Sequence, residues 1–473
     1  MQTVPLNIAG PTGASISGQN NPQVTRNFFI QATPAGVSDY ILLPTPGQLA
    51  FCTQAAAHRG SVEYLGQTYA VNGTNLISIN SSGTATVRGV VPGSGRCIFA
   101  PVFDTSLEAY GLIIATEGKR YYYNQSTVAL MTDIDLYAGN SVAVMNDVAI
   151  FDATNGDLVH SVYGDPTNVS SFFATANTNQ DELVRVYVFG QLVYAMGDRT
   201  IELWAYNGAT TEFIFTRQEQ ATITVGLGAC YSVANDKDFV YFLGSDKMFY
   251  RLKSAFAEPI STPEITQAVE RFATYDDAEG YCYQQDGQHF YHVTFPAADK
   301  SFLFNASNGT WTEVCSGLSA GRHNTGSLVN CYGKNYVFDA DTGSCFELKS
   351  GLFADDSDII RRERITSVLH GGVFGAPGKR IFYGMLELIC EIGVGLATGQ
   401  GVNPLVMMSY SDDGGKTWSA ELDGELGEMG DYHYTVRWHG LGSAYKRVFR
   451  FAITDPVFAS FHSATVDVEA GTS

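Results

Sequence analysis

The chain has 473 residues, which predicts more than one domain and a core large enough to need no disulfide or metal. It contains 49 Gly, 26 Tyr and 29 Phe but only 16% charged residues, a balance that favours an all-β protein. Its formal net charge of -20 argues against tight binding of DNA or RNA, whose phosphates it would repel.

Residues 1–45 contain the segments NPQV, TPAG and PTPG, and we expect them to form an extended N-terminal arm. The start, MQTVPLNIAGPTGAS, lacks the basic and apolar regions of a signal peptide. No apolar run approaches the ~20 residues that span a membrane, so no membrane insertion is expected. None of the eight cysteines forms a C-x-x-C pair, which predicts free, buried thiols in a chain made in a reducing cytosol.

One unit recurs between about residues 46 and 352: an aromatic-rich strand, a polar turn with glycine, and a second strand. Asn-Gly and Thr-Gly turns between alternating apolar residues predict β-hairpins. The examples are YAVNGTNLISI (69–79), AIFDATNGDLVHSV (149–162), LWAYNGATTEFIF (203–215), FLFNASNGTWTEV (302–314) and YVFDADTGSCFEL (336–348). A hairpin cannot bury its face alone, so this repeat predicts a β-propeller-like domain of six or seven blades, with a β-solenoid as the rival.

Helix signals are scarce. The best is ISTPEITQAVERFA, where Ser261 is expected to cap a short helix that Pro263 opens and that runs through Phe272. A weaker candidate helix is SDIIRRERITSVL, at residues 357–369. The composition changes after Phe353, and the alternating strands from about 370 predict a C-terminal β-sandwich domain over 353–473.

That last domain carries SYSDDGGKTWS, which has the S-x-D-x-G-x-T-W spacing of the Asp-box found in sialidases and related β-propeller proteins. The five matching residues are Ser411, Asp413, Gly415, Thr417 and Trp418. Ser and Asp side chains can bind backbone amides across a turn, and Gly can take a positive φ. Each position therefore has a folding reason, and we expect a structural turn.

The remaining motifs supply no chemistry. A glycosidase needs two positioned carboxylates, or a tyrosine nucleophile with an acidic partner in a sialidase, and no nearby motif completes such a set. His289 and His292 are three apart in an expected strand, so they point to opposite faces. Asp339 and Asp341 are too few for a calcium cage. We expect no catalytic, cofactor-binding or metal site, and hence no enzyme and no cofactor.

Three stretches together suggest a family. They are GDRTIELWAYNGATTEFIF (197–215), GQHFYHVTFPAADKSFLFNASNGTWTEV (287–314), and MSYSDDGGKTWS followed by GDYHYTVRWHGLGSAYKRVFRFAITDPV. In order and spacing they resemble the packaged-DNA stabilisation protein, or tail accessory factor, of short-tailed bacteriophages. Two shorter stretches, LPTPGQLAF and GSGRCIFAP, resemble the family more weakly and extend the resemblance over nearly the whole chain.

The resemblance implies a structural virion protein, the hub or nozzle of the tail. It implies a homohexameric ring below the portal and its adaptor that extends and closes the DNA channel. Such a ring retains packaged DNA, seats a tail needle or plug, and has tailspikes or fibres nearby. The family further implies assembly in the host bacterial cytoplasm and a place in the virion tail.

Two alternatives stay open at this point. The first concerns the role of the acidic charge: either it serves solubility alone, or it gives an acidic surface past which DNA slides without binding. The other function considered is a carbohydrate-binding or sialidase-like β-propeller, which the Asp-box spacing suggests. Glycan binding, or release of a chromogenic sugar, would distinguish it from the tail protein.

Overall fold

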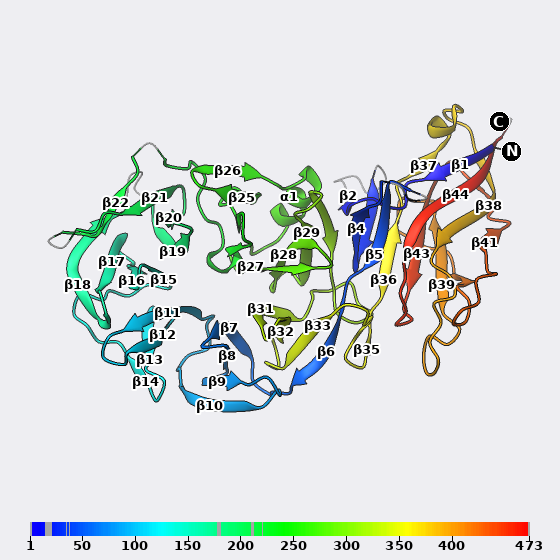
Figure 1. Ribbon diagram of the computed structural model, residues 1–473. Coiled ribbons are helices and arrows are strands. Elements are labelled where there is room, and N and C mark those ends of the chain that lie inside the picture. Colours follow the sequence, from blue (N-terminus) through cyan, green and yellow to red (C-terminus); the bar gives the residue numbers. More distant parts are fainter. Residues whose placement is uncertain are drawn as a thin grey trace.

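The computed structural model describes residues 2–14, 21–34, 36, 38–176, 181–209, 212–219 and 221–471. Nearly all regular structure in these ranges is β-strand, with a single α-helix, α1 (Pro263–Glu270), so the all-β prediction is confirmed. Figure 1 shows a ring of small sheets on one side and a sandwich on the other, with both chain ends at the sandwich.

Seven antiparallel four-stranded units surround the ring axis within the described residues, at the upper limit of the predicted six or seven blades. The first three blades are β7–β10 (His58–Tyr64, Gln67–Asn72, Asn75–Ile79, Ala85–Val90), β11–β14 (Ile98–Asp104, Ala109–Thr116, Lys119–Tyr123, Val128–Leu130) and β15–β18 (Val142–Met145, Val148–Asp152, Asp157–Val162, Asp165–Thr175). The next three are β19–β22 (Leu183–Phe189, Leu192–Gly197, Ile201–Tyr206, Phe215–Arg217), β23–β26 (Ala234–Asn235, Val240–Leu243, Phe249–Lys253, Phe256–Pro259) and β27–β30 (Glu279–Gln285, Gln288–Phe295, Lys300–Asn305, Thr310–Glu313).

The seventh blade closes the ring. It joins β31 (Thr325–Cys331), β32 (Lys334–Asp339) and β33 (Cys345–Lys349) to β6 (Gly47–Cys52), a strand from the beginning of the propeller. The core between this blade and the first contains Ile77 and Ile79 beside Tyr336 and Phe338. Neighbouring blades thus bury each other's apolar faces, as the repeat predicted.

The five hairpins expected from the repeat are all present. They are the pairs β8–β9, β16–β17, β21–β22, β29–β30 and β32–β33. Gly309 takes φ 72° in the fourth and Gly343 takes φ 70° in the fifth, values that favour glycine. Thr210 and Thr211 of the expected 203–215 hairpin lie outside the described residues.

The C-terminal domain is a two-layered β-sandwich, as expected. One layer holds β38 (Ile381–Cys390), β41 (Val436–His439), β42 (Ser443–Ala444) and β44 (Phe461–Ala470). The other holds β36 (Arg362–Ile365), β37 (Leu369–His370), β39 (Leu405–Ser411), β40 (Leu422–Glu425) and β43 (Lys446–Ile453). Phe451 and Phe461, one from each layer, pack with ring centroids 6.3 Å apart.

The first 45 residues differ from the expected extended arm. Their described part forms β1 (Gln2–Leu6), β2 (Gly13–Ala14), β3 (Pro22–Arg26), β4 (Phe28–Ala32) and β5 (Tyr40–Pro44). Strands β1 and β5 pair with β44, and β3 pairs with β36, so these strands complete both layers of the sandwich. The reason lies in Phe28, Phe29 and Ile30, which are all buried: three consecutive apolar side chains need cover on both faces of a strand.

Strand β4 receives that cover from two domains. Phe28 and Ile30 belong to the sandwich core, whereas Phe29 packs edge-on against Phe290 of the sixth blade, with ring centroids 5.3 Å apart. Residue 1, residues 15–20 and residues 35 and 37 of the expected arm lie outside the described residues. The N-terminal segment therefore joins the propeller to the sandwich.

Both helix predictions need correction. Helix α1 starts at Pro263 as expected, but Thr262 is the cap: its Oγ1 accepts a hydrogen bond from the amide of Ile265. Ser261 Oγ instead accepts one from the amide of Phe249. The segment 357–369 forms β35 (Asp358–Ile359), β36 and the start of β37 instead of a helix, since its backbone pairs with β43.

Candidate functional site

The Asp-box turn links β39 to β40 and is closed by its own polar groups. Ser411 Oγ accepts from the amide of Gly415 at 2.8 Å and donates to Asp413 Oδ1 at 2.7 Å. Asp413 also accepts from the amide of Lys416 at 2.9 Å and from Thr417 Oγ1 at 2.6 Å. These hydrogen bonds hold the pKa of Asp413 well below its usual range, and the bond from Thr417 Oγ1 contributes most. The Ser411 hydroxyl and the Asp413 carboxylate are thus both engaged in folding the turn.

Two arginines fix the turn to the sandwich. The Arg447 side chain is 2% exposed and binds the Asp412 carboxylate through Nε and Nη2, at 2.7 and 2.8 Å. Arg450 lies over the Trp418 ring, 4.4 Å from its centroid. Gly415 has φ 90°, the backbone conformation expected of it. The structure brings the five expected residues together as a scaffold turn beside β43.

Arg450 also belongs to a group of charged residues between the sandwich and the propeller. This junction cluster consists of Arg26, Glu313, Arg361, Glu363, Glu421 and Arg450. Arg26 of β3 is central, since its Nη2 lies 2.8 Å from Glu313 of β30 and its Nη1 lies 2.5 Å from Glu363 of β36. Burial alone would lower the pKa of Arg26, but the two carboxylates outweigh it and raise that pKa.

In the same region, backbone pairing also connects the two domains. Strand β3 pairs with β30 through Arg26 and Glu313 and with β36 through Val24 to Arg26, so one sheet runs from the sixth blade into the sandwich. Asn27, at φ 56°, donates to the carbonyl of Arg361 and accepts from the amide of Cys315. Its side chain therefore joins the chain after β30 to the chain before β36.

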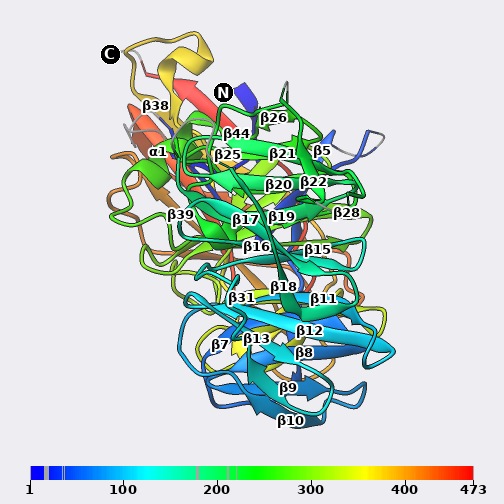
Figure 2. The same cartoon turned by 90° about the vertical axis from the view of Figure 1, so that its left-hand side faces the viewer.

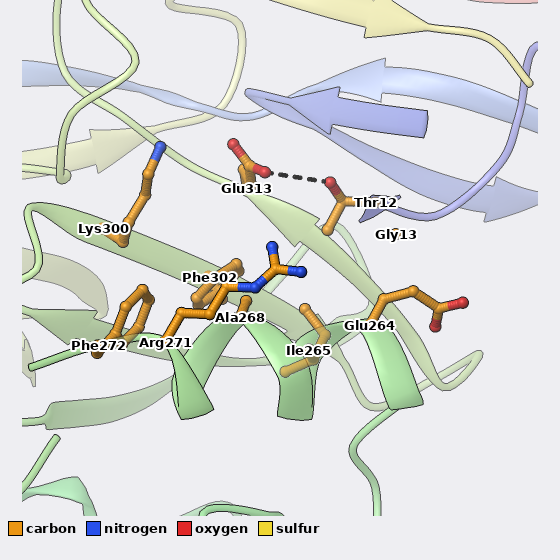
Figure 3. A pocket seen from close by; sticks show the side chains of 10 residues that line it. All are labelled: Thr12, Gly13, Glu264, Ile265, Ala268, Arg271, Phe272, Lys300, Phe302 and Glu313. Carbon is orange, nitrogen blue, oxygen red and sulfur yellow. Dashed lines mark hydrogen bonds between the residues drawn. The ribbon is translucent and has the colours of Figure 1, made fainter. Parts of the chain in front are cut away.

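A pocket of about 200 Å³ opens beside this junction, between α1, the β2 region and the sixth blade (Figure 3). Ile265, Ala268, Phe272 and Phe302 form its apolar side, and Thr12 Oγ1 donates to Glu313 Oε1 at 3.4 Å. Arg271 and Lys300 supply positive charge at its edge. These lining residues include no histidine or cysteine and no pair of converging carboxylates, so they form no catalytic set.

A second, polar pocket of about 220 Å³ is lined by the inner strands of several blades. Arg96 and Arg185 are among its lining residues, and both have partners: Arg96 Nε lies 3.2 Å from Glu279 Oε1, and Arg185 donates to the carbonyl of Cys230 at 2.6 Å. The two histidines singled out in the sequence have different surroundings: His289 Nδ1 is 4.0 Å from Asp236 Oδ2, and the buried His292 stacks on Tyr281.

No group of three His, Cys, Asp or Glu side chains in the described ranges could hold a metal ion. The Asp339 carboxylate accepts hydrogen bonds from the amides of Asp341 and Thr342 within its own turn. Asp341 forms an ion pair with Arg322 at 2.9 Å. No helix in the described part of the chain is long and apolar enough to cross a membrane.

Comparison with protein families decides the identity. The family described as "Bacteriophage P22 Gp10, beta-propeller" matches residues 2–351, and the one described as "Bacteriophage P22 Gp10, beta-sandwich" matches residues 367–469. The chain belongs to the bacteriophage P22 Gp10 family. It is a structural protein of a phage tail and hence a virion component, which confirms the resemblance seen in the sequence motifs.

Other comparisons add little for this member of the P22 Gp10 family. No curated protein matches it. Among solved structures, the WD40 β-propeller domain of Doa1 is 11% identical with a TM-score of 0.41, covering 64% of this chain and 97% of that one. BamB from Moraxella catarrhalis is 11% identical with a TM-score of 0.39, covering 74% of this chain and 97% of that one.

Sequence analysis missed the junction cluster of this P22 Gp10 family member. Arg26, Glu313 and Glu363 are far apart in the chain and belong to no motif. The available signal was the run RRER at 361–364, whose Arg362, Glu363 and Arg364 are all buried. Charged residues are almost never fully buried unless they are paired, so a charged run inside a strand pattern calls for partners from elsewhere.

Proposed function

We propose that the protein is the hub or nozzle of the tail, a homohexameric ring below the portal and its adaptor. The ring extends the DNA channel, closes it, retains the packaged DNA, and seats the tail needle or plug with tailspikes or fibres nearby. It is assembled in the host cytoplasm and acts without catalysis. The observation that carries the proposal is the match of both domains, residues 2–351 and 367–469, to one phage tail family.

The charge of the chain supports passage of DNA rather than a grip on it. The 48 Asp and Glu residues outnumber the 28 Lys and Arg residues, so the chain as a whole repels phosphates. Contacts from lysine and arginine are what release the counterions that drive nucleic acid binding. DNA therefore passes through the channel without sequence-specific binding, and retention comes from closure of the ring and from the plug.

The junction between the domains supports a mechanical role. A channel that holds packaged DNA has to resist a force between its parts, so independent movement of propeller and sandwich would be a weakness. Strand β3 and the junction cluster join them through one continuous sheet and through ion pairs that are largely shielded from water. Shielded pairs are screened by salt much less than exposed ones.

The outer edge of the third blade supports contact between copies. Strand β18 is 11 residues long, pairs with no strand except β17 among the described residues, and lies in front in Figure 2. Phe173 on it is 58% exposed, and Tyr163 in the preceding turn is 69% exposed. Open edges with exposed aromatic side chains are suited to burial against another chain.

Packaged heads with and without this protein provide the test. Heads made without it should lose DNA to added nuclease, and purified protein added back should restore protection. Heads that keep their DNA and their infectivity without the protein would overturn the proposal. A second arm measures release of a chromogenic sugar, which we expect not to occur.

A further inference from the structure

The seam that closes the propeller brings two cysteines together. Strand β6 is the fourth strand of the seventh blade and pairs antiparallel with β33, so this pairing joins the beginning of the domain to its end. In the register of that pairing Cys52 stands directly opposite Cys345. Both are free thiols in the structure.

Their surroundings place both side chains in one buried core. Cys52 is 7% and Cys345 1% exposed, and both belong to the cluster that contains Tyr336 and Phe338. Side chains of opposed residues in an antiparallel pair lie on the same face, with Cβ atoms about 4.5–5.5 Å apart. A disulfide needs about 3.5–4.5 Å between its Cβ atoms, so a shift of roughly 1 Å suffices.

The backbone beside the pair can provide that shift. The register changes after Cys345, because Phe346 stands opposite Ala50, and this leaves Phe51 as an extra residue in β6. Such a bulge bends a strand locally and adapts its path. None of the other cysteines with a described strand partner faces another cysteine: Cys282 faces Tyr291, Cys331 faces Lys334 and Cys390 faces Phe461.

We propose that Cys52 and Cys345 form a redox latch, a disulfide that locks the closing strand of the propeller once the protein meets an oxidising environment. The oxidant is a small disulfide of the oxidised-glutathione class. One protein thiolate attacks it and releases the first small thiol, and the second protein thiolate then displaces the other from the mixed disulfide. The two cysteine sulfurs are oxidised, two small thiols are formed, and the two cysteine protons pass to solvent and to the leaving thiolates.

The burial of the pair determines when the latch closes. Burial, together with the nearby Cys52, raises the pKa of Cys345 well above its ordinary value, so the reactive thiolate is scarce while β6 is in place. Exchange therefore requires β6 to detach briefly, and low concentrations of urea should accelerate it. That this change of environment occurs when the virion leaves the host rests on the proposed function; the chemistry of the pair does not.

The test uses the full-length protein with oxidised glutathione as the probe. The reduced chain has eight thiols, and we expect six after oxidation, with Cys52 and Cys345 in one disulfide-linked peptide by mass spectrometry. The linkage should raise the thermal midpoint by roughly 5 °C, because it constrains the unfolded chain, and reduction should reverse this. Cys345→Ala should abolish the gain, whereas Cys331→Ala, in the same core, should keep it.

Three results would overturn the latch: eight titratable thiols after oxidation in low urea, glutathione left on one of the two cysteines, or a linked pair without a higher thermal midpoint. Peptide mapping of the wild-type chain needs no variant, so a substitution that fails to fold leaves the test intact. None of these measurements involves ring assembly or DNA retention, so failure of the latch and failure of the proposed function are distinguishable.

Discussion

Arg26 and Glu313 are the residues through which β3 meets the sixth blade, and they are paired twice: in the backbone register, and through their side chains at 2.8 Å. The same guanidinium binds Glu363 of the sandwich. One side chain therefore connects the two domains, with only 13% of it exposed.

Replacing that side chain tests the junction. Arg26→Met should lower the free energy of unfolding by about 3–5 kcal/mol, because it leaves two shielded carboxylates without their partner. Urea unfolding measures this, and limited proteolysis should show earlier cleavage between the domains. Arg251→Met, which breaks the more exposed pair with Glu258, should cost less than about 1 kcal/mol. Equal effects from the two variants would contradict a special role for Arg26.

The Asp-box turn should behave as scaffold. Asp413→Ala removes the acceptor for the Lys416 amide and the Thr417 hydroxyl, so we expect a lower thermal midpoint without any change in sugar chemistry. Asp423→Ala in β40, exposed and close in sequence, is the matched control and should change little. Sugar release by the wild-type chain that Asp413→Ala abolishes without destabilisation would favour the sialidase-like alternative.

The same turn predicts sensitivity to acid. The pKa of Asp413 is lower in the folded chain than its usual value of 3.8, so its contribution to stability is present above about pH 4 and is lost as the pH falls below that. Thermal unfolding of wild type and Asp413→Ala between pH 6 and pH 3 should therefore converge on acidification. Curves that stay equally far apart at every pH would contradict this.

A buried carboxyl group near the domain boundary gives the opposite pH dependence. Burial raises the pKa of Asp355 from 3.8 to about 7, although the Arg362 charge opposes it. Between these values the folded chain keeps a proton that the unfolded chain has lost, so this group's contribution to stability falls as the pH rises from about 4 to 7. The unfolding free energy of wild type minus that of Asp355→Asn should fall by up to about 1.4 kcal/mol per pH unit there. A difference that does not change with pH would contradict the raised pKa.

The exposed edge of the third blade predicts a variant that blocks assembly. Phe173→Asp places a charge where another copy is expected to bury an aromatic ring, so ring formation should be lost while the thermal midpoint of the monomer stays within about 2 °C. Val87→Asp, on the outer strand of the first blade and 61% exposed in the wild type, is the control and should assemble normally. Light scattering reports both. Normal rings from Phe173→Asp would rule out this edge as the contact.

Local sequence patterns predicted the parts of the fold that are local. Hairpins such as FLFNASNGTWTEV were recognisable because the turn glycine and the alternating apolar residues lie within a few positions of each other. The Asp-box was recognisable for the same reason, since Ser411, Asp413 and Thr417 bind one another across a single turn.

The features that sequence analysis missed depend on partners far away in the chain. No residue close to Phe29 in the sequence indicates that its ring packs against Phe290. Likewise, no residue close to Arg26 indicates its ion pair with Glu313. SDIIRRERITSVL suggested a helix because its arginines and glutamate are good helix formers. Pairing with β3 and β43 overrides that propensity and makes the segment a strand. The cap of α1 fell one residue later than expected, at Thr262, because Ser261 is engaged by β25.

Electron microscopy of the purified protein mixed with its portal adaptor tests the central claim most directly. We predict closed rings with six-fold symmetry that extend the channel of adaptor-capped heads, with the sandwich and propeller of each copy in the fixed arrangement seen here. A protein that stays monomeric even on adaptor-capped heads would contradict the account.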